Sequence, residues 1–326
     1  MRGGSDSSAP ADWRPTASVD ALGLRARLLS GVREFFAERG VLEVETPSLA
    51  RAGASDPHIA SLATTCAIVG RLYLQTSPEF AMKRLLAAGS GPIYQICRAF
   101  RDGERGRLHN PEFTLLEWYR PGFDHHRLMD ELDALVDRVL GPGPPVRRLT
   151  YRDAFVARVG IDPFDADTDT LRARAEMSGL VLDEDEGADR DTLLEFLFSH
   201  AVQPALGDGR VCVYDYPASQ AALARVREGE PPVAERFELF VNGLEIANGY
   251  HELANAEEQR ARFTADDRAR AQEGLDRMPA DERLLAALSH GLPDCAGVAV
   301  GLDRLFMIAA GASRIDAVMA FPVDRA

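Results

Sequence analysis

Residues 93–120 read IYQICRAFRDGERGRLHNPEFTLLEWYR, and this stretch decides the fold. Two apolar, aromatic-rich runs flank a polar loop that contains Gly103, Gly106 and an Asn-Pro pair. Apolar runs of strand length on either side of such turn-forming residues are typical of a long antiparallel hairpin. We therefore expect a β-hairpin here, with the rest of the chain arranged around it.

Each arm of this hairpin carries one charged residue on an otherwise apolar face. Side chains of a strand alternate between two faces. One face holds Gln95, Cys97, Ala99 and Arg101 in the first arm, and Phe113, Leu115, Glu117 and Tyr119 share a face in the second. One interpretation is that Arg101 and Glu117 pair with each other or reach solvent at an edge. The other is that they form the floor of a site for a ligand with an anionic and a cationic group.

The composition is that of a soluble globular protein. The chain has 326 residues, of which 46% are hydrophobic and 27% charged. Apolar runs do not approach membrane-spanning length, and the first twenty residues lack the apolar core of a signal peptide, so we expect a cytoplasmic protein. The net charge of −14 argues against a broad basic surface for nucleic acid.

The cysteines and the basic residues give no further motif. Cys66, Cys97, Cys212 and Cys295 are far apart and form no CxxC pair, which predicts neither a zinc site nor a disulfide framework. Basic residues are nearly all arginine, and Lys83 is the only lysine. We interpret this as compositional bias.

The N-terminal part predicts a flexible tail over residues 1–18, a helix over 22–39 and a short strand in VLEVETP at 41–47. Residues 72–90 predict a strand that runs into a helix. Ser77 is placed as the N-cap, Pro78 at the first helical position and Glu79 in the first turn. Capping alone explains these three residues. The alternative is that Glu79 binds a ligand amine at a strand-to-helix junction.

The C-terminal half predicts helices at 125–140 and 256–272, a mostly helical region at 150–207 with an acidic connector at 183–191, and strands from Val211 onward. Asn242-Gly243 predicts a second hairpin, around which Glu238, Glu245 and Glu252 are spaced seven apart. Buried carboxylates are costly unless a metal ion, an ammonium ligand or arginines balance them.

The last cluster is LPDCAGVAVGLDRLFMIAAG at residues 292–311. A strand of small residues from Gly297 to Gly301 leads into an apolar helix. Its glycines permit close approach of a ligand, and Arg304 is expected to project from the first helical turn.

Taken in order, GVLEVETP, the FR…HNPEF pair and GVAVGLDR resemble the three signature motifs of class II aminoacyl-tRNA synthetases. TSPE, HNPEFTLLEWY, EIANGYHEL and GLDRL are most similar to the lysyl branch. The resemblance extends from about residue 20 to the end of the chain. It implies an α+β catalytic domain over residues 19–326, built on an antiparallel six-stranded sheet flanked by helices, with a helical insert at about 125–207 and a dimer formed through the first motif.

Lysyl-tRNA synthetases carry a β-barrel anticodon-binding domain before this core, and here only a short tail precedes the first helix. We therefore expect no stable tRNA binding. The lack of a long apolar run separately predicts no membrane association. YDYPASQAAL at 214–223 and the ending VDRA are similar to the lysyl-tRNA synthetase-like ligases that attach (R)-β-lysine to a lysine of elongation factor P. That resemblance implies ATP and Mg²⁺ as cofactors and elongation factor P as the protein acceptor.

The resemblance also implies a role for each site residue. Arg101 and Arg304 would be catalytic, clamping the α- and γ-phosphates of ATP, while Phe113 would stack on adenine. Glu238 and Glu245 would bind the metal ion. The implied ATP-binding residues are Arg101, Asp102, Gly103, Glu104, His109, Asn110, Phe113, Glu245, Ile246, Gly301 and Arg304. The implied substrate-binding residues are Ser77, Pro78, Glu79, Glu117, Tyr119, Asn248, Glu252 and Ala299.

Two positions depart from the family pattern. The second motif usually reads Phe-Arg-x-Glu, whereas here Glu104 comes one place later, so its contact with ATP is left open. Ala299 stands where lysine-activating synthetases commonly have glycine, and its methyl group is expected to favour β-lysine over α-lysine.

Three other functions remain open at this stage. A truncated lysyl-tRNA synthetase acting on α-lysine would charge tRNA. A non-catalytic regulatory paralogue would lack a phosphate clamp, which is present here. An amide ligase of the asparagine synthetase kind would need a pocket for an acidic side chain, which these glutamates would repel.

Overall fold

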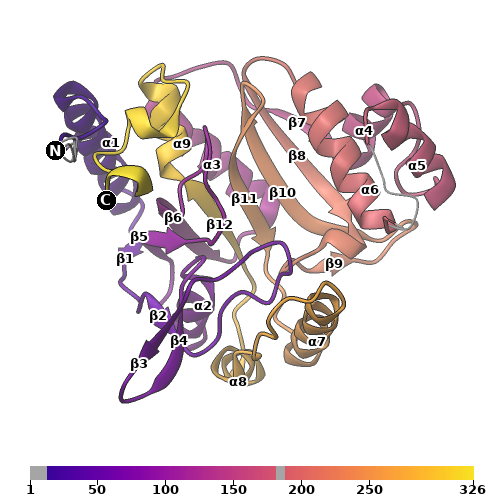
Figure 1. The fold of residues 1–326 in the computed structure, drawn as a ribbon, viewed down its shortest axis with the longest axis horizontal. Coiled ribbons are helices and arrows are strands. Elements are labelled where there is room, and N and C mark those ends of the chain that lie inside the picture. The colour runs from indigo at the N-terminus through magenta and orange to yellow at the C-terminus, as the bar shows by residue number, and fades with distance from the viewer. Residues whose placement is uncertain (1–12, 181–187) are drawn as a thin grey trace, which may run out of the picture.

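A nine-stranded mixed sheet forms the centre of the computed structural model, which describes residues 13–180 and 188–326 (Figure 1). The strands run in the order β1 (Leu42–Glu43), β5 (Ile93–Phe100), β6 (Glu112–Pro121), β12 (Cys295–Gly301), β11 (Leu244–His251), β10 (Val233–Val241), β8 (Arg210–Pro217) and β7 (Arg147–Thr150), with β9 (Val226–Arg227) paired to β10. The two predicted hairpins, β5–β6 and β10–β11, are both confirmed as antiparallel pairs.

The prediction of six antiparallel strands was wrong in size and in the direction of the outer strands. The six strands from β5 to β8 are antiparallel neighbours, but β1 pairs with β5 and β7 pairs with β8 in parallel. β1 is only two residues long, and its first residue, Leu42, lies opposite Ile93. A strand of two residues is too short to show an alternating pattern in the sequence. Only its pairing with β5 in the sheet identifies it.

One face of the sheet is covered by α1 (Val19–Ala37), α3 (His125–Leu140) and α9 (Leu302–Ala309), which share a core with the central strands. Phe36 and Trp118 are fully buried in this core and contact each other edge to face. Because α3 contributes buried residues throughout its length to the same core, it belongs to the main body. The predicted helical insert therefore starts later than residue 125.

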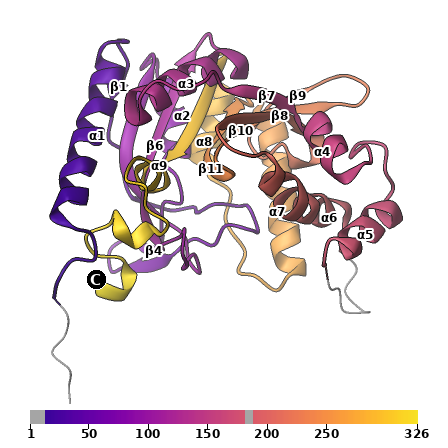
Figure 2. The ribbon, with the colours of Figure 1, turned by 90° about the horizontal axis from the view of Figure 1, so that it is seen from above.

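A second helical cluster lies against β8, at the opposite end of the molecule from α1 (Figure 2). It contains α4 (Tyr151–Val159), α5 (Thr168–Met177), α6 (Arg190–Leu197), a π-helical turn (Phe198–Val202) and a 3-10 turn (Gln203–Ala205). This confirms a mostly helical segment there. The acidic connector predicted at 183–191 falls for the most part outside the described residues.

The third core joins α2 (Glu79–Ala87), α7 (Ala256–Gln272) and α8 (Glu282–His290) beneath the large sheet. A small sheet of β2 (Leu49–Ala50), β4 (Gly70–Leu74) and β3 (Ala63–Cys66) lies beside α2 (Figure 1). Short 3-10 turns occupy Ala218–Gln220, Ile315–Ala317 and Val323–Arg325.

The two ends of the described chain are joined. Thr16 donates its backbone N–H to Ala320 and its hydroxyl to Met319, and Ala17 is buried. The tail predicted for residues 1–18 therefore includes at least two residues that pack on the domain. Across residues 13–180 and 188–326, we find no helix with the length and apolar character needed to span a bilayer, and the four cysteines are unpaired.

Candidate active site

A row of mostly polar residues, called the polar row below, crosses the middle of the large sheet. Residues opposite each other in neighbouring strands share a face. The row consists of Gln95, Glu117, Ala299, Asn248 and Glu238, one from each of β5, β6, β12, β11 and β10. An adjacent row contains Tyr119, Gly297, Tyr250 and Arg236. The predicted strand faces thus bring residues from distant parts of the chain onto one surface.

Glu117 is a deeply buried carboxylate of this surface. Its side chain is 2% exposed, and it accepts hydrogen bonds from the Ser77 hydroxyl at 2.7 Å and the Tyr119 hydroxyl at 2.6 Å. Burial, together with the nearby charge of Glu79, raises the pKa of Glu117 to about 8. Since a buried carboxylate gains most from a neighbouring cation, Glu117 is suited to bind an ammonium group. Pairing with Arg101, the other interpretation of the sequence, is not what the structure shows.

Ser77 links this carboxylate to α2. The helix begins at Glu79, so Pro78 is at the cap position and Ser77 precedes it. Our N-cap assignment was wrong by one residue. The Ser77 hydroxyl still accepts the backbone N–H of Glu79 at 3.0 Å, which satisfies one free amide of the first turn.

Lys83 is the site residue that the sequence reasoning missed. Its side chain is 1% exposed, and Nζ lies 2.6 Å from Oε1 of Glu79 and 2.6 Å from Oε2 of Glu252. Burial opposes the positive charge, but the two carboxylates outweigh it and raise the pKa of Lys83. Two signals were available: Lys83 is four residues after Glu79 on a helix, and it is the only lysine.

Glu252 is held mainly by charge. In the described part of the chain, neither of its oxygens accepts a hydrogen bond of good geometry, so the contact with Lys83 is an ion pair. Burial raises the pKa of Glu252 to about 7, although Lys83 acts in the opposite direction. A buried carboxylate with unused acceptor capacity can bind a second ammonium group.

Gly297 makes room for this cluster. A Cβ atom at this position would lie 2.3 Å from Cε1 of Tyr119 and 2.6 Å from Oε1 of Glu252. Both side chains therefore lie directly over the glycine, and any larger residue in β12 would displace them.

The other end of the surface is positively charged. The Arg101 guanidinium lies 5.1 Å from the centre of the Phe113 ring and 3.3 Å from Oε1 of Glu104. Arg304, in the first turn of α9 as predicted, donates to the Glu245 carbonyl at 3.0 Å and contacts Nε2 of His109 at 2.6 Å. Because arginine can only donate, Nε2 of His109 is the acceptor.

The surroundings of His109 disfavour its protonated form. Burial lowers the pKa of His109, and the charges of Arg304 and Arg101 lower it further. Arg101 and Arg304, both predicted to clamp phosphates, therefore lie close enough to His109 to lower its pKa. An anion bound there would meet two guanidinium groups and a neutral ring.

The other residues predicted to bind ATP contact groups of neighbouring segments. Asp102 accepts the N–H of Gly103, whose φ of +76° favours glycine. Glu104 reaches Arg101 despite its shifted place. The Asn110 amide donates to the Glu112 carbonyl and accepts from Val323, so it holds the C-terminal segment. Ile246 is buried, and its carbonyl lies next to Gly301.

Two carboxylates of the β10–β11 hairpin could hold a metal ion. Glu238 is buried, accepts the Tyr216 hydroxyl at 2.8 Å and pairs with Arg236. Burial raises the pKa of Glu238, against the effect of Arg236, and Glu245 raises it further. Because these two carboxylates repel each other, a divalent cation between them fits the charge of the site.

A second ionisable group lies elsewhere, at His125, Glu235 and His251. His251 contacts Oε2 of Glu235 at 2.6 Å with Nδ1 and Oδ1 of Asp294 at 2.9 Å with Nε2. Burial opposes its charge, but these carboxylates raise the pKa of His251. An imidazolium paired on both sides explains this cluster without an ion.

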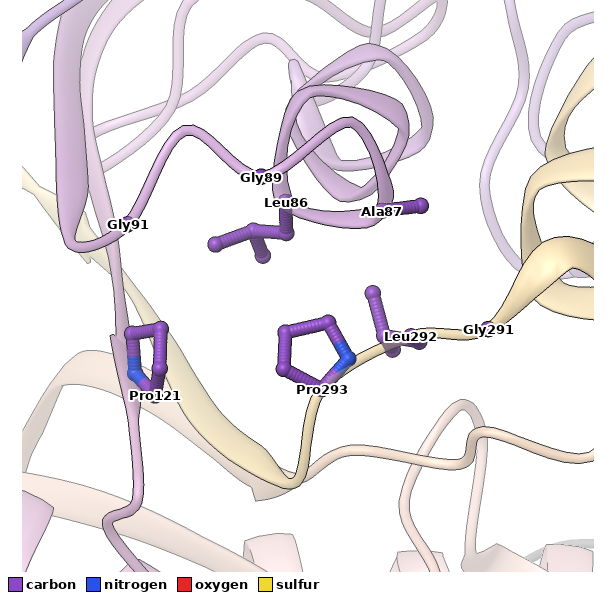
Figure 3. Close-up of a pocket in the computed structure, with 8 residues that line it drawn as sticks. All are labelled: Leu86, Ala87, Gly89, Gly91, Pro121, Gly291, Leu292 and Pro293. Atoms are coloured by element: carbon purple, nitrogen blue, oxygen red, sulfur yellow. The ribbon is translucent and has the colours of Figure 1, made fainter.

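A pocket of about 530 Å³ lies between the end of α2 and the segment that follows α8 (Figure 3). It is lined by Leu86, Ala87, Gly89, Gly91, Pro121, Gly291, Leu292 and Pro293. Glycines, prolines and aliphatic side chains offer no charge to a nucleotide, and none of the predicted site residues lines it.

A family model described as tRNA synthetases class II (D, K and N) matches residues 9–325. The chain belongs to this family. Among curated proteins, the elongation factor P–(R)-β-lysine ligase of Vibrio cholerae is 53% identical over 321 residues, covering 97% of this chain and 99% of the relative. The ligases of the same name from Edwardsiella ictaluri and Salmonella typhi are 52% and 50% identical, over 97% and 98% of this chain and 99% and 100% of those proteins.

The sheet surface of this class II synthetase has two oppositely charged ends. Glu79, Glu117 and Glu252 gather at one end with Tyr119, while Arg101 and Arg304 gather with His109 at the other. Asn248 and Ala299 lie between these ends in the polar row. The surface can therefore bind a cationic group and a polyphosphate at once.

Proposed function

We propose that this class II synthetase activates (R)-β-lysine with ATP and transfers it to a lysine side chain of elongation factor P. The curated relatives named for that reaction match nearly the whole chain. The observation that carries the proposal is the buried carboxylate cluster of Glu79, Glu117 and Glu252 on the same sheet surface as Arg101 and Arg304. A diamino acid has two ammonium groups to pair with such a cluster.

The chemistry follows from alignment and charge. The substrate carboxylate attacks the α-phosphorus of ATP, the bond to the β-phosphate breaks, and pyrophosphate leaves. Arg101 stabilises the charge that builds on the α-phosphate, and Arg304 with neutral His109 holds the outer phosphates. The amine of the acceptor lysine then attacks the acyl carbon, and AMP leaves. The chain supplies no covalent nucleophile for these steps.

Glu238 and Glu245 would hold Mg²⁺. The ion supplies charge neutralisation to the phosphates when it is bound. The mutual repulsion of the two carboxylates supports this assignment, because the pKa of Glu238 is raised by burial and by Glu245. Carboxylate oxygens are the ligands that this cation prefers.

Substrate binding is coupled to a proton at Glu117. With a pKa raised by burial to about 8, Glu117 is mostly protonated in the free enzyme at neutral pH. An ammonium group arriving beside it favours the ionised carboxylate, so binding releases a proton. The hydrogen bonds from Tyr119 and Ser77 lower the pKa of Glu117 and so favour the ionised form.

Ala299 would set the preference between lysine isomers. It lies opposite both Glu117 and Asn248 in the sheet, so its methyl group projects from the floor between the two ends of the site. A methyl group in a pocket discriminates between ligands by about 1–3 kcal/mol.

The proposal also covers the oligomeric state, tRNA binding and the cellular location. We infer a homodimer through β1, where Leu42 is 57% exposed at the edge of the sheet. The net charge of −14 disfavours stable tRNA binding. We place the enzyme in the cytoplasm, together with its acceptor.

ATP–pyrophosphate exchange with α-lysine and with (R)-β-lysine tests the first step, and mass spectrometry of elongation factor P and of tRNA tests the second. We expect exchange to be faster with (R)-β-lysine and a mass increase of one lysyl group on the factor. Charging of tRNA with no mass change on the factor would instead identify a truncated lysyl-tRNA synthetase.

A further inference from the structure

Lys83 is unusual because every other basic residue of the chain, apart from the histidines, is arginine. Of 37 lysines and arginines, it is the only lysine. It is also one of the largest fully buried side chains, in the middle of α2. A compositional bias toward arginine accounts for the arginines at exposed positions. It does not account for a lysine at this buried position beside the polar surface.

The contacts of Lys83 show what its ammonium group does. Nζ bridges Oε1 of Glu79 and Oε2 of Glu252, each at 2.6 Å. Glu252 has no other cation this close in the described residues, and its oxygens accept no well-aligned hydrogen bond. Lys83 therefore holds two carboxylates from distant parts of the chain, Glu79 at the start of α2 and Glu252 directly after β11.

The charge of the cluster is matched to a particular ligand. With every group ionised, Glu79, Glu117, Glu252 and Lys83 together carry two negative charges. A ligand with two ammonium groups neutralises this cluster. A ligand with one ammonium leaves a buried carboxylate unpaired, which is costly.

The compact ammonium group matters as well as its charge. An arginine is longer and presents a planar fork of five donors, whereas lysine presents a point charge with three rotatable donors. Next to Lys83, Met82 is fully buried and Leu86 nearly so. A guanidinium group would extend past the carboxylates into the space of the ligand amine.

We propose that Lys83 is a positioning and specificity residue, a built-in ammonium that fixes Glu79 and Glu252 and tunes the pocket to a diamino acid. The inference rests on the proposed function, because it assumes that the cluster binds the substrate amines. Lys83 acts through the two carboxylates and does not itself touch the substrate.

The proposal predicts a distinctive pH dependence. Glu252 interacts with Lys83 and Glu79 from α2, Glu117 and Tyr119 from β6, Cys295 from β12, and Tyr250 and His251 from the end of β11 directly before it. Burial already raises the pKa of Glu252 to about 7 with Lys83 present. Without Lys83, Glu252 would bind a proton at neutral pH and lose its attraction for an ammonium group.

The test compares Lys83→Met with Arg84→Met, which removes the exposed basic residue next to it. For Lys83→Met at pH 7, we expect the KM for (R)-β-lysine to rise by about tenfold or more, while the KM for ATP stays within about twofold. Raising the pH toward 9 should recover part of the lost affinity. Arg84→Met should leave both constants unchanged. A lysine KM unchanged in Lys83→Met, or a parallel rise of both KM values, overturns the proposal.

Two further variants keep the test decisive. Lys83→Arg retains the charge, and we expect it to preserve the KM for ATP but not the KM for (R)-β-lysine. Full rescue by arginine would refute the requirement for a compact ammonium. Lys83→Met combined with Glu252→Gln removes one charge of each sign, so it should fold even if the single variant does not. We expect this double variant to lose the preference for diamino over monoamino acids, and a retained preference would contradict the inference.

Activity of the wild-type enzyme distinguishes a failure of the proposed function from a failure of the role given to Lys83. If it shows no exchange with any lysine isomer, the proposed function fails. If it is active and Lys83→Met leaves the lysine KM unchanged, the inference alone fails.

Discussion

The Ser77 hydroxyl donates a hydrogen bond of 2.7 Å to the Glu117 carboxylate and thereby joins the start of α2 to the central sheet. The same oxygen accepts the backbone N–H of Glu79. One small side chain thus contacts both the first turn of a helix and a buried carboxylate.

Ser77→Ala should weaken binding of the amino acid. Ser77 lowers the pKa of Glu117 against the larger effect of burial, so its loss leaves this carboxylate more strongly protonated. We expect a several-fold higher KM for (R)-β-lysine at pH 7 and a smaller effect at pH 9. Pyrophosphate exchange across this pH range measures it. Ser77→Thr, which keeps the hydroxyl, is the control, and an equal defect in both variants would speak against the hydrogen bond.

The free enzyme should lose stability as the pH rises from about 5 to about 8. Burial raises the folded-state pKa of Glu117 to about 8 and that of Glu252 to about 7, both above the ordinary value of 4.5. Raised pKa values mean that the folded state binds these protons more tightly than the unfolded state, so removing them costs stability. Melting temperatures over this range should fall less in Glu117→Gln. A profile identical to that of the wild type would refute the assignment.

Arg101→Lys should lower pyrophosphate exchange by about 10²-fold while the melting temperature changes little. Lysine keeps the charge but lacks the planar fork that holds a phosphate at two points. Steady-state exchange at saturating ATP separates this effect from ATP binding. Arg105→Lys, in the same loop and highly exposed, should behave as the wild type. Near-normal activity of Arg101→Lys would remove Arg101 from the phosphate clamp.

Gly297→Ala should destabilise the fold by about 1–3 kcal/mol and abolish amino-acid binding. The new Cβ would lie 2.3 Å from Tyr119 and 2.6 Å from Glu252, so both must move. Gly301→Ala is a matched control in the same strand, because its Cβ would be 3.8 Å from the Ile246 carbonyl, an ordinary contact. Chemical denaturation compares the two variants. Equal stability would mean that the cluster above Gly297 adapts freely.

Ala299→Gly should improve activation of α-lysine. The methyl group lies between Glu117 and Asn248 in the polar row, and removing it widens the pocket floor. We expect the ratio of exchange rates for (R)-β-lysine over α-lysine to fall by up to about 10- to 100-fold. Equal exchange rates with α-lysine in the two proteins would disprove this role.

Local sequence patterns were sufficient for the elements that carry the site. The alternation in residues 93–120 gave the correct face for Phe113, Leu115, Glu117 and Tyr119, and the cross-strand pairs confirm it. Asn242-Gly243 marked the second hairpin because both residues adopt positive φ there. The bounds expected for the helices at 125–140 and 256–272 agree with α3 and α7.

Other features had no local signature. β1 and β7 are too short to show a period, and their parallel pairing depends on strands far away in the sequence. The apolar side of α3 packs in the main core, and the pattern of residues 125–140 alone does not say which core that side meets.

The sequence by itself determined the two hairpins and the three motifs, and with them the family. Only the tertiary structure decided which of the charged residues face one another. Lys83 and Glu252 lie in distant segments, and their contact exists because α2 packs in one core with residues of β6 and β12, close to the end of β11. Periodicity encodes which face a side chain occupies, whereas the partner of a buried charge depends on the order of strands and helices in space.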